Sequence, residues 1–195
     1  MRELDIAIEF TEFERDRVGD LYWGAFGKKL GVAFVNDATG AQATRAAMRP
    51  DRVLVARVDG VVAGVCGFYE EGSGAADFTW KGLSEILPLW QAIWASLALS
   101  VLARSERNGA LVLDGICVDP TLRGSGIGSA LLSNATDYAR ERRLTAVRLS
   151  VIDDNPRAEA LYRRRGFESA GSGTIGWLRH LYGFNRYRVM EKNVR

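Results

Sequence analysis

Three alternate glycines stand at the start of a predicted helix, and their spacing is the first feature of the chain that suggests chemistry. They are Gly124, Gly126 and Gly128, within "VDPTLRGSGIGSALL" (residues 118–132), and Arg123 precedes them. Glycine in a regular element costs roughly 0.5–1 kcal/mol relative to alanine, so this junction needs backbone without side chains. The free N–H groups and the dipole of a helix start bind phosphate or pyrophosphate. Arg123 would add a charged donor.

The spacing of these glycines narrows the choice of phosphate ligand. It is not Gly-x-Gly-x-x-Gly, the dinucleotide fingerprint, and no Gly-Lys-Ser/Thr is present, which argues against a nucleoside triphosphate loop. What remains is Arg-x-x-Gly-x-Gly, read from Arg123, Gly126 and Gly128. Taken alone, this pattern also fits a glycine-rich helix entrance that binds nothing.

A second segment, "NPRAEALYRRRGF" (residues 155–167), follows one predicted strand later. Together with the Arg-x-x-Gly-x-Gly loop, it resembles the GNAT superfamily of N-acetyltransferases. The residues that carry the likeness in this segment are Asn155, Ala158, Leu161, Tyr162, Gly166 and Phe167. Both motifs occur in the family's order and at its separation, and the resemblance covers about residues 111–167. "ICVDP" (residues 116–120) is also similar to the family strand that carries the cofactor.

The resemblance implies acetyl-CoA as the donor co-substrate and a primary amine as the acceptor. The CoA pyrophosphate would lie on N–H groups at the helix start, and the pantetheine arm would bond to the preceding strand like an added strand. The implied cofactor-binding residues are Ile116, Cys117, Val118, Arg123, Gly124, Ser125, Gly126, Ile127, Gly128, Asn155 and Tyr162. The family strand usually splays at a bulge, which would leave the Val118 N–H free to stabilise an oxyanion.

Tyr162 and Asn155 match family positions that act toward the cofactor. Tyr162 would protonate the departing CoA thiolate, and its ordinary pKa near ~10 keeps the hydroxyl protonated at neutral pH. A tyrosine that only packs on an amphipathic helix fits the same pattern. Asn155 would contact the pantetheine, or cap the helix that begins beside Pro156, or do both.

The base that deprotonates the amine is less determined by the sequence. We expect Asp114, because it precedes Val118 by an even number of residues on the cofactor strand, so that the two side chains share a face unless a bulge intervenes. Glu70 and Glu71, at the end of the preceding hairpin, are alternatives, as is water without a dedicated base. A covalent acyl group on Cys117 is not favoured, because no histidine accompanies it in sequence and the family reaction is direct transfer.

The elements around these motifs form a mixed α/β pattern. Alternating or Val-rich runs predict strands at residues 3–10, 110–120 and 145–152, a hairpin over residues 52–71 with Asp59-Gly60 as its turn, and a strand that ends the tail. Helical spacing predicts helices at residues 11–31, 37–49, 127–138 and 153–166. With the resemblance, this predicts a single domain over residues 1–195, with a GNAT-like, mostly antiparallel central sheet flanked by helices.

An apolar helical insertion, about residues 78–105, precedes the cofactor strand. "LPLWQAIWASLALSVLA" (residues 87–103) is shorter than the roughly 20 residues that a membrane span needs, and Pro88 and Gln91 interrupt its start. We therefore expect no membrane span and a helix that is buried on most sides. The insertion and the aromatic tail would wall or cover the acceptor pocket. Extra core or a dimer face is the alternative.

Composition limits the remaining classes of function. The net charge of +2 gives no reason to expect nucleic acid as a partner. Cys66 and Cys117 lie in apolar runs, which indicates buried free thiols, and two cysteines with one histidine do not predict a metal site. Charges in the N-terminal "MRELDIAIEF" argue against a signal peptide, so we expect a cytoplasmic protein.

The sequence thus predicts an enzyme, an acetyl-CoA-dependent N-acetyltransferase that needs no metal. The amine, either a small molecule or a peptide, would attack the thioester directly through a tetrahedral intermediate. A homodimer is compatible with the apolar insertion. The alternative from another class is a non-catalytic acyl-CoA-binding or partner-binding module on the same fold.

Overall fold

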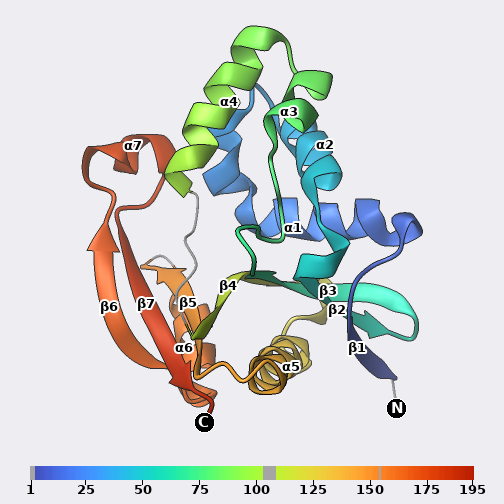
Figure 1. Cartoon of the computed structure of the whole chain (residues 1–195), viewed down its shortest axis with the longest axis vertical. Helices are drawn as coiled ribbons and strands as arrows, with labels where there is room; N and C mark the ends of the chain where they lie inside the picture. Colours follow the sequence, from blue (N-terminus) through green and yellow to red (C-terminus); the bar gives the residue numbers. More distant parts are fainter. Residues whose placement is uncertain (1–2, 103–108, 154) are drawn as a thin grey trace.

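A mixed sheet organises the chain in this computed structural model, which describes residues 3–102, 109–153 and 155–195 (Figure 1). The described residues form seven strands in the spatial order β1-β2-β3-β4-β5-β7-β6. The strands are β1 (Leu4–Ile8), β2 (Val53–Val58), β3 (Val61–Tyr69), β4 (Ala110–Val118), β5 (Ala146–Ile152), β6 (Glu168–Thr174) and β7 (Arg186–Asn193). Only the β4–β5 pair is parallel, which confirms the mostly antiparallel sheet.

Helices cover both faces of this sheet, as the fold prediction required. Figure 1 shows α1 to α4 on one side of the sheet and α5 and α6 on the other. The helices are α1 (Arg15–Leu30), α2 (Asp37–Ala47), α3 (Trp80–Ile86), α4 (Leu89–Leu102), α5 (Ile127–Glu141), α6 (Pro156–Arg164) and α7 (Arg179–Tyr182). Short 3-10 turns lie at η1 (Glu12–Glu14), η2 (Gly31–Ala33), η3 (Pro50–Arg52), η4 (Pro120–Leu122) and η5 (Gly176–Leu178).

Buried apolar side chains form three clusters that place the helices. One cluster fills the space between the sheet and α5, and includes Phe68, Leu111 and Leu131. A second joins α1 to the opposite face of the sheet. A third lies under α4, where small side chains of that helix pack on α1 and α2.

The β2–β3 hairpin has the turn that the sequence predicts. Asp59 has φ 51° and Gly60 has φ 78°, so both central residues are left-handed. Two consecutive left-handed residues form the turn type whose twist matches that of paired strands. This turn fixes the register of β3, against which β4 then pairs.

Strands β4 and β5 part after a short paired stretch, and this opening is the feature that positions the site. They pair only from Ala110–Val112 to Ala146–Arg148. On its other edge β4 contains a bulge: Gly115 pairs with Gly67 and Leu113 with Phe68, so that Asp114 is the extra residue. A bulge bends the strand that carries it and increases its twist. The second half of β4 therefore lies against β3 alone.

Two expectations about the elements are wrong. Strand β6 was not predicted, because "ESAGSGT" lacks the alternating β-branched residues typical of strands. It forms a strand because it pairs with β7. The insertion forms two helices that part at Pro88, and α4 is not buried on most sides, because Leu89 and Trp90 are each 67% exposed. The last residues of the expected insertion, 103–105, lie outside the described part. Among the described residues no helix is long and apolar enough to cross a membrane.

Candidate active site

The glycine loop joins β4 to α5 and leaves its backbone open to a ligand. Gly124 has φ 86° and Gly126, the residue before α5, has φ 92°, conformations that side chains rarely adopt. A Cβ built on either glycine meets nothing within 4 Å, so both positions face open space. The first N–H of α5 that bonds back along the helix is that of Ala130, to the Gly126 carbonyl at 3.0 Å. The N–H groups of Ile127, Gly128 and Ser129 thus have no helical acceptor, the arrangement that binds anions.

Polar contacts hold the entrance of this loop in shape. Asp119 accepts from the Thr121 N–H at 2.8 Å and forms an ion pair with Arg17 of α1. The hydrogen bonds from Thr121 and the Arg17 guanidinium lower the pKa of Asp119 to about 2. Ser125 donates from its hydroxyl to the Leu122 carbonyl at 2.6 Å. The exposed Arg123 donates from Nε to the Val118 carbonyl at 3.4 Å, which keeps its guanidinium at the junction of strand and loop.

The last residues of β4 point part of their backbone into the opening between the strands. Asp119 donates its N–H to Ala63 of β3 at 2.8 Å, and residues of an antiparallel strand alternate in direction. The N–H and C=O groups of Val118 and Ile116 therefore point away from β3, toward β5. Because β5 pairs with β4 only up to Val112, no described strand bonds to them on that side. An extended chain in the opening would find these groups at the edge.

The bulge places Asp114 and Val118 on opposite faces of the sheet, which corrects the expectation that they share one. Val118 packs into the cluster under α5. Asp114 instead accepts from the Ala75 N–H at 2.8 Å, and Ala75 belongs to the cluster on the α1 side. The neighbouring Gly115 also faces α1, where a Cβ would collide with the Phe26 ring. Two consecutive residues on one face reverse the alternation that follows.

A cavity of about 1010 Å³ lies on the α1 side, at the opening between β4 and β5. Its floor includes Val112 and Asp114 of β4 and Ser150 of β5. Its walls come from α1, from the loop over residues 72–78, from α4 and from the segment that joins β6 to β7. Seven of the lining residues are aromatic: Tyr22, Phe26, Tyr69, Phe78, Trp80, Phe184 and Tyr187. Asp114 thus stands where the cavity meets the strand that the sequence assigns to the cofactor.

The two rival glutamates are engaged elsewhere and do not line this cavity among the described residues. Glu70 accepts from the Tyr138 hydroxyl at 2.9 Å on the α5 side and pairs with Arg142 at 3.3 Å. Burial and the Glu70 carboxylate raise the pKa of Tyr138 to about 12. Glu71 pairs with the buried Arg52 at 2.9 Å. Of these three carboxylates, Asp114 is the one that lines the cavity in the described part of the chain.

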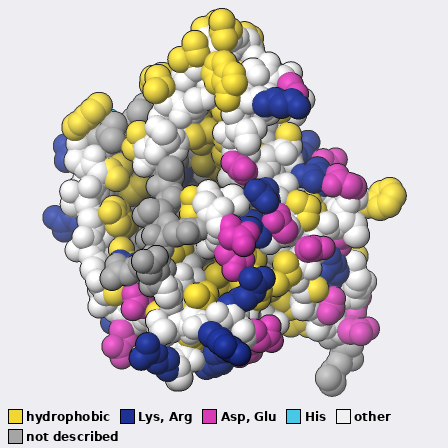
Figure 2. Space-filling model, in the orientation of Figure 1, with side chains coloured by type: hydrophobic (Ala, Val, Ile, Leu, Met, Phe, Trp, Pro, Cys, Tyr) yellow, Lys and Arg dark blue, Asp and Glu magenta, His cyan; other side chains and the backbone are white. Residues whose placement is uncertain are grey.

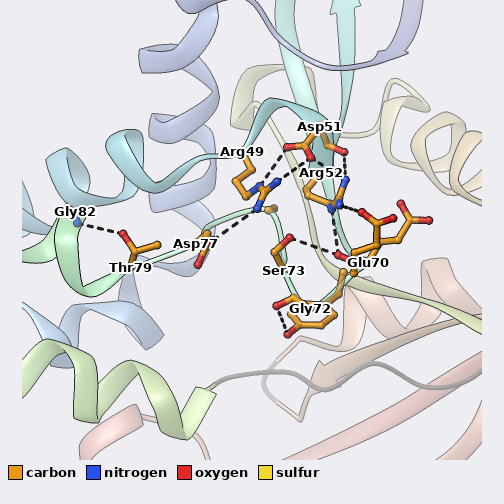
Figure 3. A network of polar contacts seen from close by, with 12 residues as sticks. Arg49, Asp51, Arg52, Glu70, Gly72, Ser73, Asp77, Thr79 and Gly82 are labelled. Atoms are coloured by element: carbon orange, nitrogen blue, oxygen red, sulfur yellow. Dashed lines mark hydrogen bonds and ion pairs between the residues drawn. The ribbon is translucent and has the colours of Figure 1, made fainter.

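Two arginines anchor the loop that forms the near wall of the cavity (Figure 3). Arg52 donates to the Glu70 carbonyl at 3.2 Å, where the loop leaves β3. Arg49 lies 3.0 Å from the Asp51 carboxylate and 3.7 Å from that of Asp77, near the end of the loop. Its own N–H donates to the Ala75 carbonyl at 2.9 Å. The loop that presents the Ala75 N–H to Asp114 is thus fixed at both ends.

Tyr162 lies on α6, and Asn155 directly precedes that helix. The Asn155 Oδ1 accepts from the Ala158 N–H at 3.1 Å, so the residue caps α6, one of the two roles expected for it. Tyr162 is buried and packs against Phe167 at 6.1 Å between ring centroids. A Cβ on Gly128 would touch Leu161 of α6 at 3.5 Å, which shows how closely the start of α5 approaches α6.

The two cysteines are buried free thiols, as predicted. Burial away from water raises the pKa of both Cys66 and Cys117 above the ordinary range of a thiol. The Cys117 side chain belongs to the apolar cluster on the α1 side. A thiol kept protonated in such surroundings is a poor nucleophile. The structure therefore gives no support to a covalent acyl group on Cys117.

Several residues that line the cavity were not predicted as site residues from the sequence. Arg148 and Ser150 alternate along β5 within "AVRLSVI" and both line the cavity. Two polar residues at alternate positions in an otherwise apolar strand indicate one face that is not packed. Phe26 and Lys29 of α1 gave no comparable signal, because they look like ordinary members of a helix. Their place in the cavity depends on how α1 crosses the sheet.

Comparison with known proteins gives one family and one fold. The profile of the Acetyltransferase (GNAT) family matches residues 15–167. An uncharacterised N-acetyltransferase of Methanocaldococcus jannaschii is 38% identical over 78 residues, which is 40% of this chain and 34% of that protein. Thialysine N-epsilon-acetyltransferase of Bos taurus is 34% identical over 81 residues, 42% of this chain and 46% of that protein. Each match thus spans less than half of the relative.

A solved structure extends the likeness in fold to nearly the whole chain. The N-acetyltransferase from Staphylococcus aureus Mu50 superposes with a TM-score of 0.69 over 96% of this chain and 99% of that one. The two sequences are 19% identical, so this likeness concerns the fold alone. It covers 96% of this chain, whereas the sequence matches to the two relatives above cover 40% and 42% of it.

Proposed function

The chain belongs to the GNAT family of acetyltransferases, and we propose that it moves an acetyl group from acetyl-CoA to the nitrogen of a primary amine. One observation supports this proposal above the others. The open glycine loop at the start of α5 continues into an unpaired strand edge, and that edge leads to an aromatic cavity that contains a carboxylate. These three features follow one another in the order that acetyl-CoA requires. The loop would hold its phosphate groups, the strand edge its extended arm, and the cavity the end that reacts.

The glycine loop is the proposed site for the CoA pyrophosphate. Its oxygens would accept hydrogen bonds from the N–H groups of residues 124–128, with the α5 dipole favouring the negative charge. Arg123 is exposed at the same junction and would pair with a phosphate oxygen. Left-handed Gly124 and Gly126 let the ligand approach without a side chain in its path.

The strand edge is the proposed site for the pantetheine arm. The arm carries amide groups, and it would bond to the backbone of Ile116 and Val118 as an additional strand. The backbone N–H and C=O of Cys117, the residue between them, point toward β3. Its side chain packs into the core. The thioester would then lie near the Val118 N–H, which would stabilise negative charge on the carbonyl oxygen. Asn155, which caps α6, would add a contact from its amide nitrogen.

The proposed reaction is a direct attack with two proton transfers. Asp114 accepts the proton of the incoming ammonium, directly or through water, and the neutral nitrogen forms a bond to the thioester carbon. The tetrahedral intermediate collapses as the carbon–sulfur bond breaks, and the electron pair leaves with sulfur. Tyr162 then protonates the CoA thiolate, and its oxygen regains a proton, through water, from the nitrogen that has become the amide. The products are an amide and CoA, and no metal takes part.

The aromatic cavity is the proposed acceptor site. It lies on the α1 side of the sheet, whereas α5 and α6 lie on the other, so donor and acceptor would meet at the opening between β4 and β5. α4 contributes Ser96, Leu99 and Ser100 to its wall, which supports the expectation that the insertion encloses the acceptor. The Bos taurus relative is named for acetylation of an amine on a small molecule, and a small amine or a peptide end would each fit a cavity of this volume.

The proposal is tested by incubating the purified chain with acetyl-CoA and a panel of amines. The panel should contain aryl-alkyl amines, polyamines, amino acids and peptides with a free N-terminus or lysine. Release of the CoA thiol together with an acetylated product in the mass spectrum is the expected result. Tight binding of acetyl-CoA with no turnover across the panel would favour the non-catalytic binding module instead.

A further inference from the structure

The aromatic ring of Phe26 occupies the place of a side chain that β4 lacks. Phe26 belongs to α1, and Gly115 follows Asp114 directly in β4. A Cβ built on Gly115 would collide with Cζ of that ring and lie 2.8 Å from Cε1 and Cε2. Gly115 does not have the left-handed backbone that requires glycine. The close approach of the ring to the strand is therefore what requires a residue without a side chain here.

Neighbours on α1 hold the ring of Phe26 in this place. The buried Tyr22 lies one turn earlier on the helix, with 4.7 Å between the two ring centroids and 53° between the ring planes. The ammonium of Lys29 lies 5.9 Å from the centroid of the Phe26 ring, a cation–π contact. Turning the ring aside would break these contacts and its packing on Gly115. Its position is thus set before any ligand binds.

The ring lies where the open edge of β4 meets the cavity. Strands β4 and β5 pair only up to Val112 and part beyond it. The pantetheine arm proposed above runs from the glycine loop past Val118 and Ile116, toward this closed end. The next residue on that path is Gly115, and Phe26 covers it on the α1 side, where it also lines the cavity. A group at the end of the arm would therefore meet the edge of the ring on this side of the sheet.

We propose that Phe26 limits the length of the acyl group that the donor carries, so that acetyl is accepted and longer chains are excluded. The inference rests on the proposed function, because it takes the edge of β4 as the site of the pantetheine arm. An acetyl group ends one carbon beyond the carbonyl. A longer chain that continued toward Gly115 would need the space that the ring fills. A chain that turned away from the ring would enter the part of the cavity proposed for the amine.

The test measures the affinity of the chain for acyl-CoA thioesters of different length by calorimetry, which requires no knowledge of the amine. The probes are CoA, acetyl-CoA and butyryl-CoA. Forcing extra methylene groups into filled space is costly, so the wild-type chain should bind butyryl-CoA at least ~10-fold more weakly than acetyl-CoA. In Phe26→Ala the longer chain enters the freed space, and burial of each methylene group raises affinity roughly fourfold. That variant should bind butyryl-CoA at least as tightly as acetyl-CoA.

A second variant keeps the test valid if the alanine variant does not fold. Phe26→Leu retains an apolar side chain of intermediate size, which preserves part of the packing on Tyr22 and Gly115. Its ratio of the two dissociation constants should lie between those of the wild-type chain and Phe26→Ala. Circular dichroism and a thermal melt show which variants are folded.

Two control variants remove an aromatic ring elsewhere. Trp80 lines the same cavity, but the three atoms nearest to a Cβ on Gly115 all belong to Phe26. Trp80→Ala should therefore keep the wild-type ratio within about threefold. Trp90 is 67% exposed and belongs to α4, whose end of the molecule in Figure 1 is where Figure 2 shows hydrophobic side chains gathered on the surface. Trp90→Ala should leave both affinities unchanged.

The outcomes separate this inference from the proposed function. If the wild-type chain binds acetyl-CoA and butyryl-CoA equally, Phe26 does not limit the acyl group. A wild-type ratio that both Phe26 variants preserve overturns the inference in the same way, and in either case the proposed function stands. A chain that binds none of the three probes overturns the proposed function and this inference with it.

Discussion

The carboxylate of Asp114 accepts a hydrogen bond of 2.8 Å from the backbone N–H of Ala75. This bond joins the bulge of β4 to the loop over residues 72–78, which forms the near wall of the aromatic cavity. The Asp114 carboxylate thus both bonds to the backbone of the loop and lies at the floor of the cavity. The backbone N–H of Ala75 thus contributes to the orientation of the proposed base.

Replacing Asp114 separates its two roles. Asp114→Asn keeps an oxygen that accepts from Ala75 but cannot take a proton from the amine, so kcat/KM should fall by roughly 10²-fold or more while the melting temperature changes little. Steady-state kinetics and a thermal melt measure the two effects. Glu70→Gln and Glu71→Gln serve as rivals and should stay within about threefold of wild type. If Asp114→Asn also stays within that range, water or another group is the base.

Tyr162→Phe should lower kcat without weakening acetyl-CoA binding. Phenylalanine preserves the packing of the buried ring on Phe167 and removes the hydroxyl that is the proposed proton donor to the thiolate. A general acid contributes roughly 10²–10⁴-fold, so a loss in kcat of at least tenfold is expected, with the Kd for acetyl-CoA unchanged.

Tyr138→Phe is the matched control for that substitution. Tyr138 is as buried as Tyr162, on α5, and its hydroxyl bonds to Glu70 at 2.9 Å. Losing that bond should cost about 1 kcal/mol of stability and leave kcat unchanged. Equal effects of the two substitutions on kcat would assign Tyr162 a packing role only.

Gly126→Ala should weaken acetyl-CoA binding at least ~10-fold, because its Cβ would occupy the space proposed for a phosphate oxygen. The backbone strain alone is controlled by Gly60→Ala in the hairpin, where φ is 78° and a Cβ also meets nothing within 4 Å. Both variants should lose about 1–2 kcal/mol of stability, since alanine pays the same left-handed penalty. Calorimetric titration with acetyl-CoA should then distinguish them. Equal affinity in both variants contradicts a phosphate site at this loop.

The ion pair between Glu14 and Arg57 should make stability depend on pH in acid. Glu14 accepts from Arg57 at 2.7 and 2.9 Å and from the Thr11 N–H at 2.8 Å, and these bonds lower its pKa to about 2. A lowered pKa stabilises the folded chain above the unfolded value of about 4.5, and this contribution is lost as the pH falls toward 2. Glu14→Gln should therefore cost about 1–2 kcal/mol at pH 7. Urea melts at several pH values should show the difference disappear near pH 2.

Much of the fold follows from local chemistry that the sequence displays. The hairpin turn at Asp59-Gly60 and the glycine loop at residues 124–128 need backbone that few residues supply, so their composition identifies them. The cap at Asn155 follows for the same reason. Each of these features is decided within a few residues, and long-range packing does not alter it.

Features decided by pairing and packing were not predictable in the same way. The bulge at Asp114 leaves no mark on the apolar pattern, yet it moves Val118 to the other face of the sheet. Strand β6 exists because β7 offers it an edge. The composition of α4 suggested burial, whereas the alanines took the inside and the tryptophans the outside. Which side of an uncharged helix is covered depends on what the rest of the chain places there.

The measurement that tests the central claim most directly is a thermal-shift titration of the wild-type chain with acetyl-CoA, beside ATP and NAD as other pyrophosphate ligands. At 100-fold its Kd a ligand adds about 2.7 kcal/mol, which for a domain of this size raises the melting temperature by roughly 5–10 °C. We expect that rise with acetyl-CoA, a smaller one with Gly126→Ala, and none of that size with ATP or NAD. No shift with acetyl-CoA, or an equal shift with all three ligands, would contradict the assignment of the glycine loop and the open edge of β4 to the acetyl donor.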